Sequence, residues 1–368
     1  MNPVILSGSD NVCLIMMKTQ PVFLLGFGGV GRALARQICD ASAMHERRNK
    51  LRLQIIGIAD SSGVLMDGSG FCDPALEQLI TRKVRGEKLT TDGPQMLTGV
   101  RSPIPSNAIV VDTTATDATV PIILEAKARG CGVVLANKLP LAGPISGWDE
   151  ITASKARWET TCGSALPVIS TLDTLLNSGD EVTRIEGSLS GTLGYLSSEL
   201  AAGTPFGEAV RVAKAQGYTE PDPRQDLGGK DVARKALILA RMLGYRLEMS
   251  DVQIESLYPV EMDALSVDEF MREVDSLNAS MAARAAALTA GGKKLRYAAT
   301  IENGQCKAGL VGADPDTKLG GIRTTDSIVI FTTQYFSDNP VAVSGRGAGQ
   351  VVTASGCLGD VVSLAKEM

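Results

Sequence analysis

The most informative stretch of this chain for its fold is Pro21-Val-Phe-Leu-Leu-Gly-Phe-Gly-Gly-Val-Gly31. Its first five residues predict a buried strand, and residues 30–41 predict a helix that follows the glycines directly. Such a turn lets a dinucleotide approach the backbone, and the helix amides then face its pyrophosphate. A tight structural turn without a ligand is the alternative. We predict a dinucleotide site at Gly26, Gly28, Gly29, Val30 and Gly31.

Strands and helices continue to alternate as far as about Arg157. Repeated strand–helix–strand units produce a parallel sheet with right-handed crossovers, so we predict an α/β domain. A polar stretch, residues 67–105, is punctuated by glycine and proline and has no element assigned to it. The expected strands are 51–58, 107–111 and 132–136, and the expected helix is 120–129.

The order of predicted elements changes after Trp158, where strands and helices no longer alternate strictly. This pattern is typical of an α+β domain. The expected strands are 182–189, 294–301 and 327–331, and the expected helices are 206–216, 231–243, 279–290 and a final helix within 347–367.

Composition excludes several classes of function. The net charge of −5, with both signs interspersed, leaves no long basic face for nucleic acid. Seven scattered cysteines without a C-x-x-C pair indicate reduced thiols and no structural zinc. No apolar run approaches the roughly 20 residues that span a bilayer, so we expect no membrane partner. We expect a soluble, cytoplasmic protein that binds a small molecule, or an organellar one if a transit peptide has been removed.

Asp60 ends the second predicted strand, where a carboxylate can accept hydrogen bonds from the adenosine ribose of NAD. Ser61 and Ser62 follow it and leave room for the 2′-phosphate of NADP. Asp60 as a simple turn residue is the alternative. The preference between the two cofactors therefore stays open.

Reduction or oxidation by a nicotinamide also requires a protein group that moves a proton. The one histidine, His45, lies in the charged stretch 44–48, which we expect to be a surface turn. The acid is then a lysine, a tyrosine or a carboxyl group.

The densest group of such residues lies between Gly217 and Lys235. Asp231 and Lys235 are four residues apart on one face of a predicted helix, which also fits a solvated ion pair. The preceding loop carries more carboxylates than a turn requires, and a substrate ammonium would use them. These carboxylates are Glu220, Asp222 and Asp226.

Two further segments hold candidates. Lys138 follows the strand 132–136 at its carboxyl end, where it can hold a carboxylate or polarise a carbonyl, or simply be solvated. The small residues 161–167 allow backbone to approach a substrate or a cation. Within them, Cys162 suggests a thiolate nucleophile, but without a histidine partner we expect a buried small residue.

Taken together, these motifs resemble homoserine dehydrogenases over about residues 21–368. The resemblance implies interconversion of L-aspartate 4-semialdehyde and L-homoserine with NAD(P), on the route to threonine and methionine. The motifs are Gly26-x-Gly-x-x-Gly31, Ala136-Asn-Lys138, Thr161-Cys-Gly-Ser-Ala-Leu-Pro167, Glu186-Gly-Ser-Leu-Ser-Gly-Thr192, Gly217-Tyr-Thr-Glu-Pro-Asp-Pro223, Asp231-Val-Ala-Arg-Lys235 and Gly347-Ala-Gly349.

The resemblance also implies roles for individual residues. Lys235 would be the proton donor, and Lys138 would be a second catalytic or substrate-orienting lysine that also contacts the cofactor. The carboxylates that would bind substrate or hold the lysines are Glu220, Asp226 and Asp231. Thr114 and Gly349 would contact the cofactor. We expect main-chain amides near Gly163 and Ser164 to hold the substrate carboxylate.

A monovalent cation, Na⁺ or K⁺, is implied as well. Its ligands would be the carboxylate of Glu159 and main-chain carbonyls of Cys162, Ser164 and Leu166. Cys162, Ser164 and Ala165 depart from the Val, Ala and Gly common in the family, although carbonyl ligands tolerate such changes.

The implied architecture has four parts. Residues 1–20 would be an extension, 21–158 a Rossmann-type domain, 159–342 a catalytic and dimerisation domain, and 343–368 a C-terminal helix returning to the first domain. We expect a homodimer, without a fused aspartokinase or an appended regulatory domain, and weak or absent threonine feedback. The alternatives are a related amino-acid aldehyde/alcohol dehydrogenase on the same scaffold and a non-catalytic dinucleotide sensor.

Overall fold

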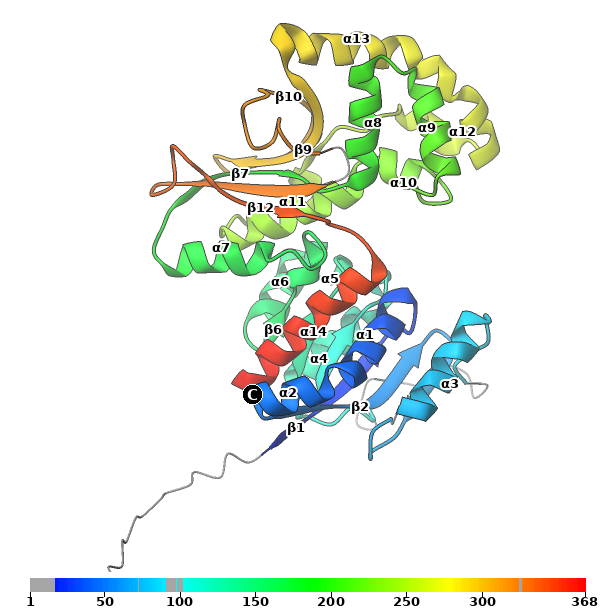
Figure 1. The fold of residues 1–368 in the computed structure, drawn as a ribbon, viewed down its shortest axis with the longest axis vertical. Coiled ribbons are helices and arrows are strands. Elements are labelled where there is room, and N and C mark those ends of the chain that lie inside the picture. The colour runs from blue at the N-terminus through cyan, green and yellow to red at the C-terminus, as the bar shows by residue number, and fades with distance from the viewer. Residues whose placement is uncertain (1–16, 72, 91–96, 98–101, 324–325) are drawn as a thin grey trace, which may run out of the picture.

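The structure is a computed structural model that describes residues 17–71, 73–90, 97, 102–323 and 326–368. The described residues form two lobes, each built around a six-stranded sheet (Figure 1). None of the described helices has the length and apolar character needed to cross a membrane.

The first sheet has the order β3-β2-β1-β4-β5-β6, and all its pairings are parallel except that of β2 with β3. The predicted parallel sheet is therefore confirmed. The order turns back between β1 and β4, so the carboxyl end of β1 lies at a topological switch point, where such sheets bind ligands. The strands are β1 (Lys18–Leu25), β2 (Leu51–Asp60), β3 (Gly63–Met66), β4 (Ile109–Asp112), β5 (Gly132–Leu135) and β6 (Ala156–Arg157).

Helices cover both faces of this sheet. Val22 and Leu24 of β1 pack with α1, α3 and α14, while Phe23 and Leu25 pack with α4 and α6 on the other face. All four side chains are fully or almost fully buried, as the period-two alternation of a strand requires. The helices of this lobe are α1 (Gly29–Asp40), α2 (Ser42–Asn49), α3 (Asp73–Val84), α4 (Val120–Ala128), α5 (Leu139–Ala142) and α6 (Ile145–Thr152).

Two expectations for this lobe are wrong, and one stretch without an assigned element contains a helix. The strand β1 begins at Lys18, so Lys18, Thr19 and Gln20 belong to the sheet rather than to an extension. The unassigned stretch 67–105 contains helix α3; residues 72, 91–96 and 98–101 of it lie outside the described residues, as do residues 1–16 of the extension.

The other wrong expectation concerns His45. It lies in helix α2 rather than in a surface turn, and it is buried. Its Nδ1 lies 2.9 Å from Nδ2 of Asn49, one helical turn later. Burial, followed by the nearby positive charges of Lys366 and Arg48, lowers the pKa of His45. The charged residues on either side of His45 have the composition of a loop, but they belong to a helix whose other side is buried.

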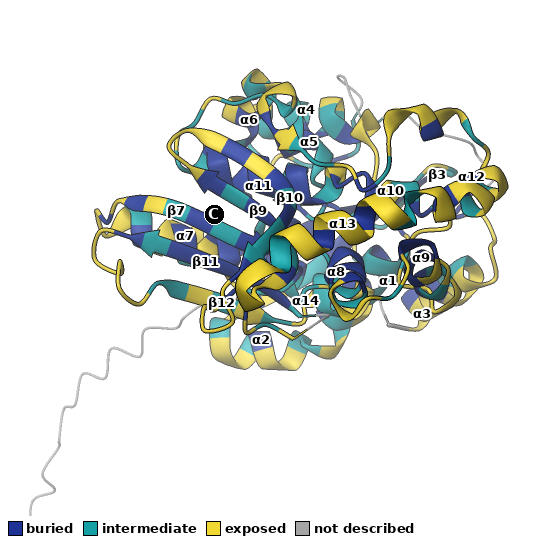
Figure 2. Ribbon diagram, turned by 90° about the horizontal axis from the view of Figure 1, so that it is seen from above, coloured by how far each residue is buried: buried dark blue, intermediate teal, exposed yellow. Residues whose placement is uncertain are grey.

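The second sheet has the order β12-β11-β7-β9-β10-β8, and only β8 pairs in parallel. Helices α8, α11 and α13 pack on one of its faces, and Figure 2 shows the exposed outer side of α13. The predicted α+β architecture is confirmed. The strands are β7 (Val182–Ser188), β8 (Gln253–Ile254), β9 (Lys294–Glu302), β10 (Gln305–Ala313), β11 (Ser327–Thr333) and β12 (Val341–Gly345). The helices are α7 (Val168–Asn177), α8 (Gly191–Ala202), α9 (Phe206–Ala215), α10 (Arg224–Leu227), α11 (Lys230–Met242), α12 (Val267–Glu273) and α13 (Asn278–Thr289).

The final helix, α14 (Gln350–Glu367), returns to the first lobe and packs beside α1, as expected (Figure 1). Its buried residues include Ala354, Cys357 and Val361, which join the core on the α1 face of the first sheet. The side chain of Lys18 also donates to the carbonyl of Ala365 at 2.6 Å. The chain thus passes between the lobes twice, after β6 and again between β12 and α14.

Candidate active site

The glycine turn has the geometry that a bound diphosphate requires. Gly26 has a φ of +90°, which favours glycine, and its N–H donates to the carbonyl of Ala59 at 2.8 Å. A Cβ on Gly31 would lie 2.1 Å from the carbonyl oxygen of Gly26, so helix α1 reaches this position only with glycine there. Gly28 has no neighbouring atom within 4 Å of a built Cβ and therefore leaves open space in front of the helix.

The loops after β4 and β5 are joined beside this turn. Asn137 donates through Nδ2 to Asp112 at 3.0 Å, to Thr114 Oγ1 at 3.2 Å and to the carbonyl of Thr116 at 2.7 Å. Thr114 in turn donates its N–H to Asp112 at 2.9 Å, and its side chain lies over Gly26. Asn137 was not predicted as a site residue. Its only signal in the sequence was an amide side chain directly after the predicted strand 132–136.

Asp60, at the end of β2, forms an ion pair with a lysine. Its Oδ2 lies 2.7 Å from Nζ of Lys83 on α3, and its Oδ1 accepts hydrogen bonds from the N–H of Ser62 at 2.8 Å and from the hydroxyl at 2.6 Å. Burial raises the pKa of Asp60, but Lys83 and Ser62 together outweigh it and lower the net pKa. The carboxylate is thus ionised and neutralised by a cation from a helix that we did not predict.

Two lysines from different lobes meet on one carboxylate. Asp231, in the first turn of α11, lies 2.7 Å from Nζ of Lys235 and 3.2 Å from Nζ of Lys138, which precedes α5. Lys235 also donates to the carbonyl of Leu189 at 2.7 Å. Burial raises the pKa of Asp231, and the two lysines lower it further than burial raises it. Asp231 therefore carries its charge at any physiological pH.

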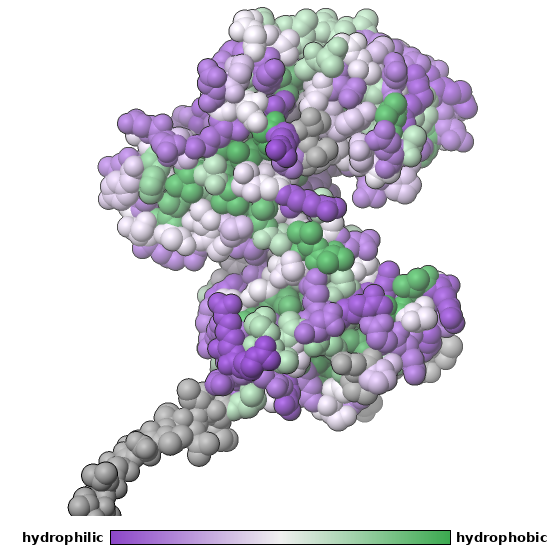
Figure 3. Space-filling model, viewed as in Figure 1, coloured by the Kyte–Doolittle hydropathy of each residue, from purple (hydrophilic) through white to green (hydrophobic). Residues whose placement is uncertain are grey.

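Lys138 and Asp231 border a pocket of about 360 Å³ whose lining comes from both lobes, and Figure 3 shows that the molecule is indented between the lobes. Asp226 accepts a hydrogen bond from the N–H of Glu220 at 2.8 Å, and burial raises the pKa of Asp226. The predicted carboxylates Glu220, Asp226 and Asp231 therefore share one pocket with Lys138. The lining residues are Lys138, Ser190, Leu193, Glu220, Gln225, Asp226, Asp231, Val232 and Arg234. Ser190, Gln225 and Arg234 were not predicted, because polar residues at these positions have the pattern of an ordinary helix cap or surface.

Gly163 and Ser164 do not line this pocket. Ser164 is buried, and its hydroxyl lies 2.8 Å from that of Thr353 on α14. Gly163 packs against Val168 and Leu166. The turn thus joins the second lobe to the returning helix instead of facing Glu220.

The other residues of this segment have local roles. Both carboxylate oxygens of Glu159 accept backbone N–H groups at the start of α7, from Ile169 at 2.6 Å and Ser170 at 3.0 Å. Cys162 is fully buried, and burial raises the pKa of its thiol to about 12. A thiol that stays protonated is a poor nucleophile. Among the described residues, no three His, Cys, Asp or Glu side chains are grouped as a metal site.

Comparison with known proteins agrees with this arrangement. The family model for the NAD binding domain of homoserine dehydrogenase matches residues 26–162, and the homoserine dehydrogenase model matches residues 167–362. A homoserine dehydrogenase of Emericella nidulans is 35% identical over 95% of this chain and 99% of its own length. The bifunctional aspartokinase/homoserine dehydrogenase of Haemophilus influenzae is 34% identical over 94% of this chain, which spans only 43% of that relative.

Solved structures show the same fold. A Candida auris protein of unknown function matches with a TM-score of 0.81 and 26% identity, covering 95% of this chain and 98% of the other. A hyperthermophilic archaeal homoserine dehydrogenase in complex with NADPH matches with a TM-score of 0.70 and 22% identity. The match covers 95% of this chain and 99% of the other. The two family models and the full-length fungal relative together show that this chain belongs to the homoserine dehydrogenase family.

Proposed function

We propose that this protein interconverts L-aspartate 4-semialdehyde and L-homoserine with NAD(P)H and NAD(P)⁺, on the route to threonine and methionine. The observation that carries the proposal is the Lys138–Asp231–Lys235 bridge at the mouth of the nucleotide-binding lobe. A dinucleotide sensor would need the glycine turn but not this bridge. The scattered cysteines favour a reducing compartment such as the cytoplasm.

The open space at Gly28 and the uncapped start of α1 fit the diphosphate of a dinucleotide. When bound, NAD(P)H supplies the hydride. Glu220 and Asp226 would bind the substrate ammonium, and Lys138 would orient the substrate or polarise its carbonyl. Lys235, which is only 11% exposed and is held by Asp231, would give the proton that the new alkoxide needs.

The direct test is the rate of nicotinamide reduction with L-homoserine and either NAD⁺ or NADP⁺. The assay should show turnover with homoserine and much less with other amino-acid alcohols. Faster turnover with another alcohol would point to a different dehydrogenase on this scaffold. Cofactor binding without turnover of any alcohol would instead indicate a sensor.

We predict that this protein accepts both cofactors, because Lys83 neutralises the carboxylate that would otherwise repel a 2′-phosphate. Replacing Lys83 with Met should lower the ratio of kcat/KM for NADPH to that for NADH about tenfold, since it removes a charge-assisted contact. Lys88→Met, an exposed lysine in the same region, should leave the ratio unchanged. An unchanged ratio in Lys83→Met would remove Lys83 from cofactor selection.

A monovalent cation, Na⁺ or K⁺, would bind to the carbonyls of Cys162, Ser164 and Leu166, with Glu159 completing the site. Support comes from the strained turn here: Ser164 has a φ of +63°, and the segment joins both lobes to α14. If such a cation is required, replacing potassium chloride with tetramethylammonium chloride in the homoserine assay should lower the rate.

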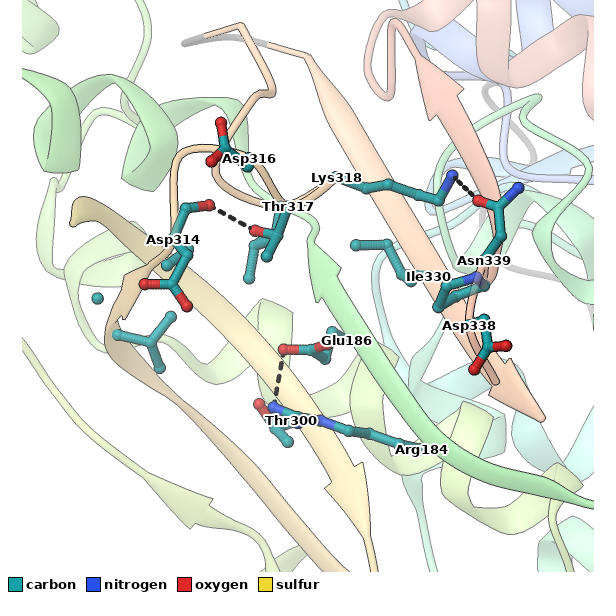
Figure 4. A pocket seen from close by; sticks show the side chains of 15 residues that line it. Arg184, Glu186, Thr300, Asp314, Asp316, Thr317, Lys318, Ile330, Asp338 and Asn339 are labelled. Atoms are coloured by element: carbon teal, nitrogen blue, oxygen red, sulfur yellow. Dashed lines mark hydrogen bonds and ion pairs between the residues drawn. The ribbon is translucent and has the colours of Figure 1, made fainter. Parts of the chain in front are cut away.

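We further propose a homodimer formed through the face of the second sheet opposite α8, α11 and α13. This face carries an apolar cluster that includes Ala298, Ile328 and Ile330, and Leu319 packs onto it from the segment after β10. Beside the cluster is a hollow of about 530 Å³. Figure 4 shows its charged lining, with Arg184 bound to Glu186 near Thr300. A mixed apolar and charged face of this kind suits a twofold contact between copies.

Thr300→Glu should therefore produce a monomer in sedimentation experiments at a concentration where the wild type is a dimer. The new carboxylate would lie near Glu186 and would face its symmetry copy, so like charges would repel across the contact. Ser280→Glu, on the exposed side of α13, is the matched control and should remain dimeric. A dimeric Thr300→Glu variant would place the contact elsewhere.

A further inference from the structure

We propose that Gln350, the first residue of α14, is a cofactor-binding residue whose side-chain amide donates to the diphosphate of the bound dinucleotide. The inference rests on the proposed function, because it assumes that the glycine turn binds NAD(P). It adds a contact from a side chain that belongs to the returning helix and not to the nucleotide-binding motif.

The position of the amide carries the argument. A Cβ built on Gly29 would lie 2.1 Å from Cδ, 2.2 Å from Oε1 and 2.4 Å from Nε2 of Gln350. The amide therefore rests directly on the Cα of Gly29, at the start of α1. A side chain at position 29 would take its place, which gives a reason for glycine at a position that the turn geometry itself does not restrict.

The surroundings of the amide are those of a ligand site. Gly28, the next residue along the turn, has open space in front of it, and the start of α1 has no side-chain cap. Gln350 as a whole is exposed, so solvent and ligands can reach its side chain. A hydrogen bond of 2.9 Å from Nε2 of Gln37 on α1 to the carbonyl of Val351 holds the two helices in this register.

The chemistry of glutamine suits this task. Its amide offers two N–H donors without a charge, and diphosphate oxygens are strong acceptors. The contact would also link α14 to the cofactor. Binding would then tie the returning helix to α1 through the ligand, as well as through the contacts already present.

The experiment measures binding of ADP-ribose, which contains the diphosphate, and of adenosine, which lacks it, to the full chain by calorimetry. In Gln350→Ala the Kd of ADP-ribose should rise about threefold to tenfold, as for loss of a partly exposed hydrogen bond to a charged group. In Gln350→Glu it should rise more than about tenfold, because a carboxylate repels the diphosphate. Adenosine binding and the melting temperature should not change.

Val351→Glu is the matched control, since Val351 is 66% exposed on the same helical turn. It adds the same charge one residue along and should change the Kd of ADP-ribose far less than Gln350→Glu does. An equal effect of the two variants would overturn the inference, because the effect would then be general electrostatics. Tighter binding in Gln350→Ala would also overturn it, because the amide would then obstruct the site.

The two proposals fail separately. A wild-type chain that binds neither ADP-ribose nor NAD(P) contradicts the proposed function itself. A wild-type chain that binds ADP-ribose, together with unchanged binding in both Gln350 variants, contradicts only the role of Gln350.

Discussion

Replacing Lys235 with Ala should lower kcat by about 10²- to 10⁴-fold, the range for loss of a general acid–base group, with no change in cofactor affinity. Nζ of Lys235 is held between Asp231 and the carbonyl of Leu189, both at 2.7 Å, and Asp231 also pairs with Lys138 of the nucleotide-binding lobe at 3.2 Å. No other described lysine is held in this way. Removing it leaves Asp231 paired with Lys138, so the variant should fold normally.

Two further variants separate the proton transfer from the charge. Lys235→Arg keeps a cation beside Asp231, but a guanidinium does not release its proton near neutral pH, so kcat should also fall strongly. Lys230→Ala, at the exposed start of the same helix, should behave like the wild type. Steady-state rates with homoserine give kcat, and a fluorescence titration with NADH gives the cofactor affinity. Normal turnover in Lys235→Ala would remove Lys235 from the mechanism.

Replacing Gly31 with Ala should weaken cofactor binding by about tenfold to 100-fold and lower the melting temperature. The new Cβ would lie 2.1 Å from the carbonyl oxygen of Gly26 and 2.9 Å from Oγ1 of Thr113. Thr113 already donates to that carbonyl at 2.8 Å, so neither atom has room to move. Helix α1 would shift away from β1, at a cost of about 1–3 kcal/mol for overpacking, and the helix amides would no longer face the diphosphate.

Two other glycines provide the comparison. Gly28→Ala meets no protein atom, so it should keep the melting temperature while its methyl group crowds the bound cofactor. Gly147→Ala, in helix α6 with open space around it, should change neither property. Thermal melts and NADH titrations of the three variants distinguish a packing defect from a lost contact. Wild-type cofactor affinity in Gly31→Ala would mean that the turn does not hold the diphosphate.

Local periodicity in the sequence was sufficient to predict the elements that carry the chemistry. The glycine turn lies between β1 and α1 as expected, and α11 places Asp231 and Lys235 one turn apart because a helix repeats every 3.6 residues. Lys138 lies three residues after the end of β5. Helix α3 and the buried position of His45 were missed, since charged residues on one side of a helix have the same composition as a loop.

The Rossmann-type lobe, the α+β lobe and the residue types of the candidate site could all be predicted from the amino-acid pattern. Four contacts could not: Lys138 and Lys235 share Asp231, Lys83 neutralises Asp60, Ser164 turns toward Thr353, and Gln350 rests on Gly29. The physical reason is the range of the interactions. Strand and helix patterns depend on neighbours within a few residues, whereas each of these contacts joins separate elements whose distance is set by how the packed cores place them.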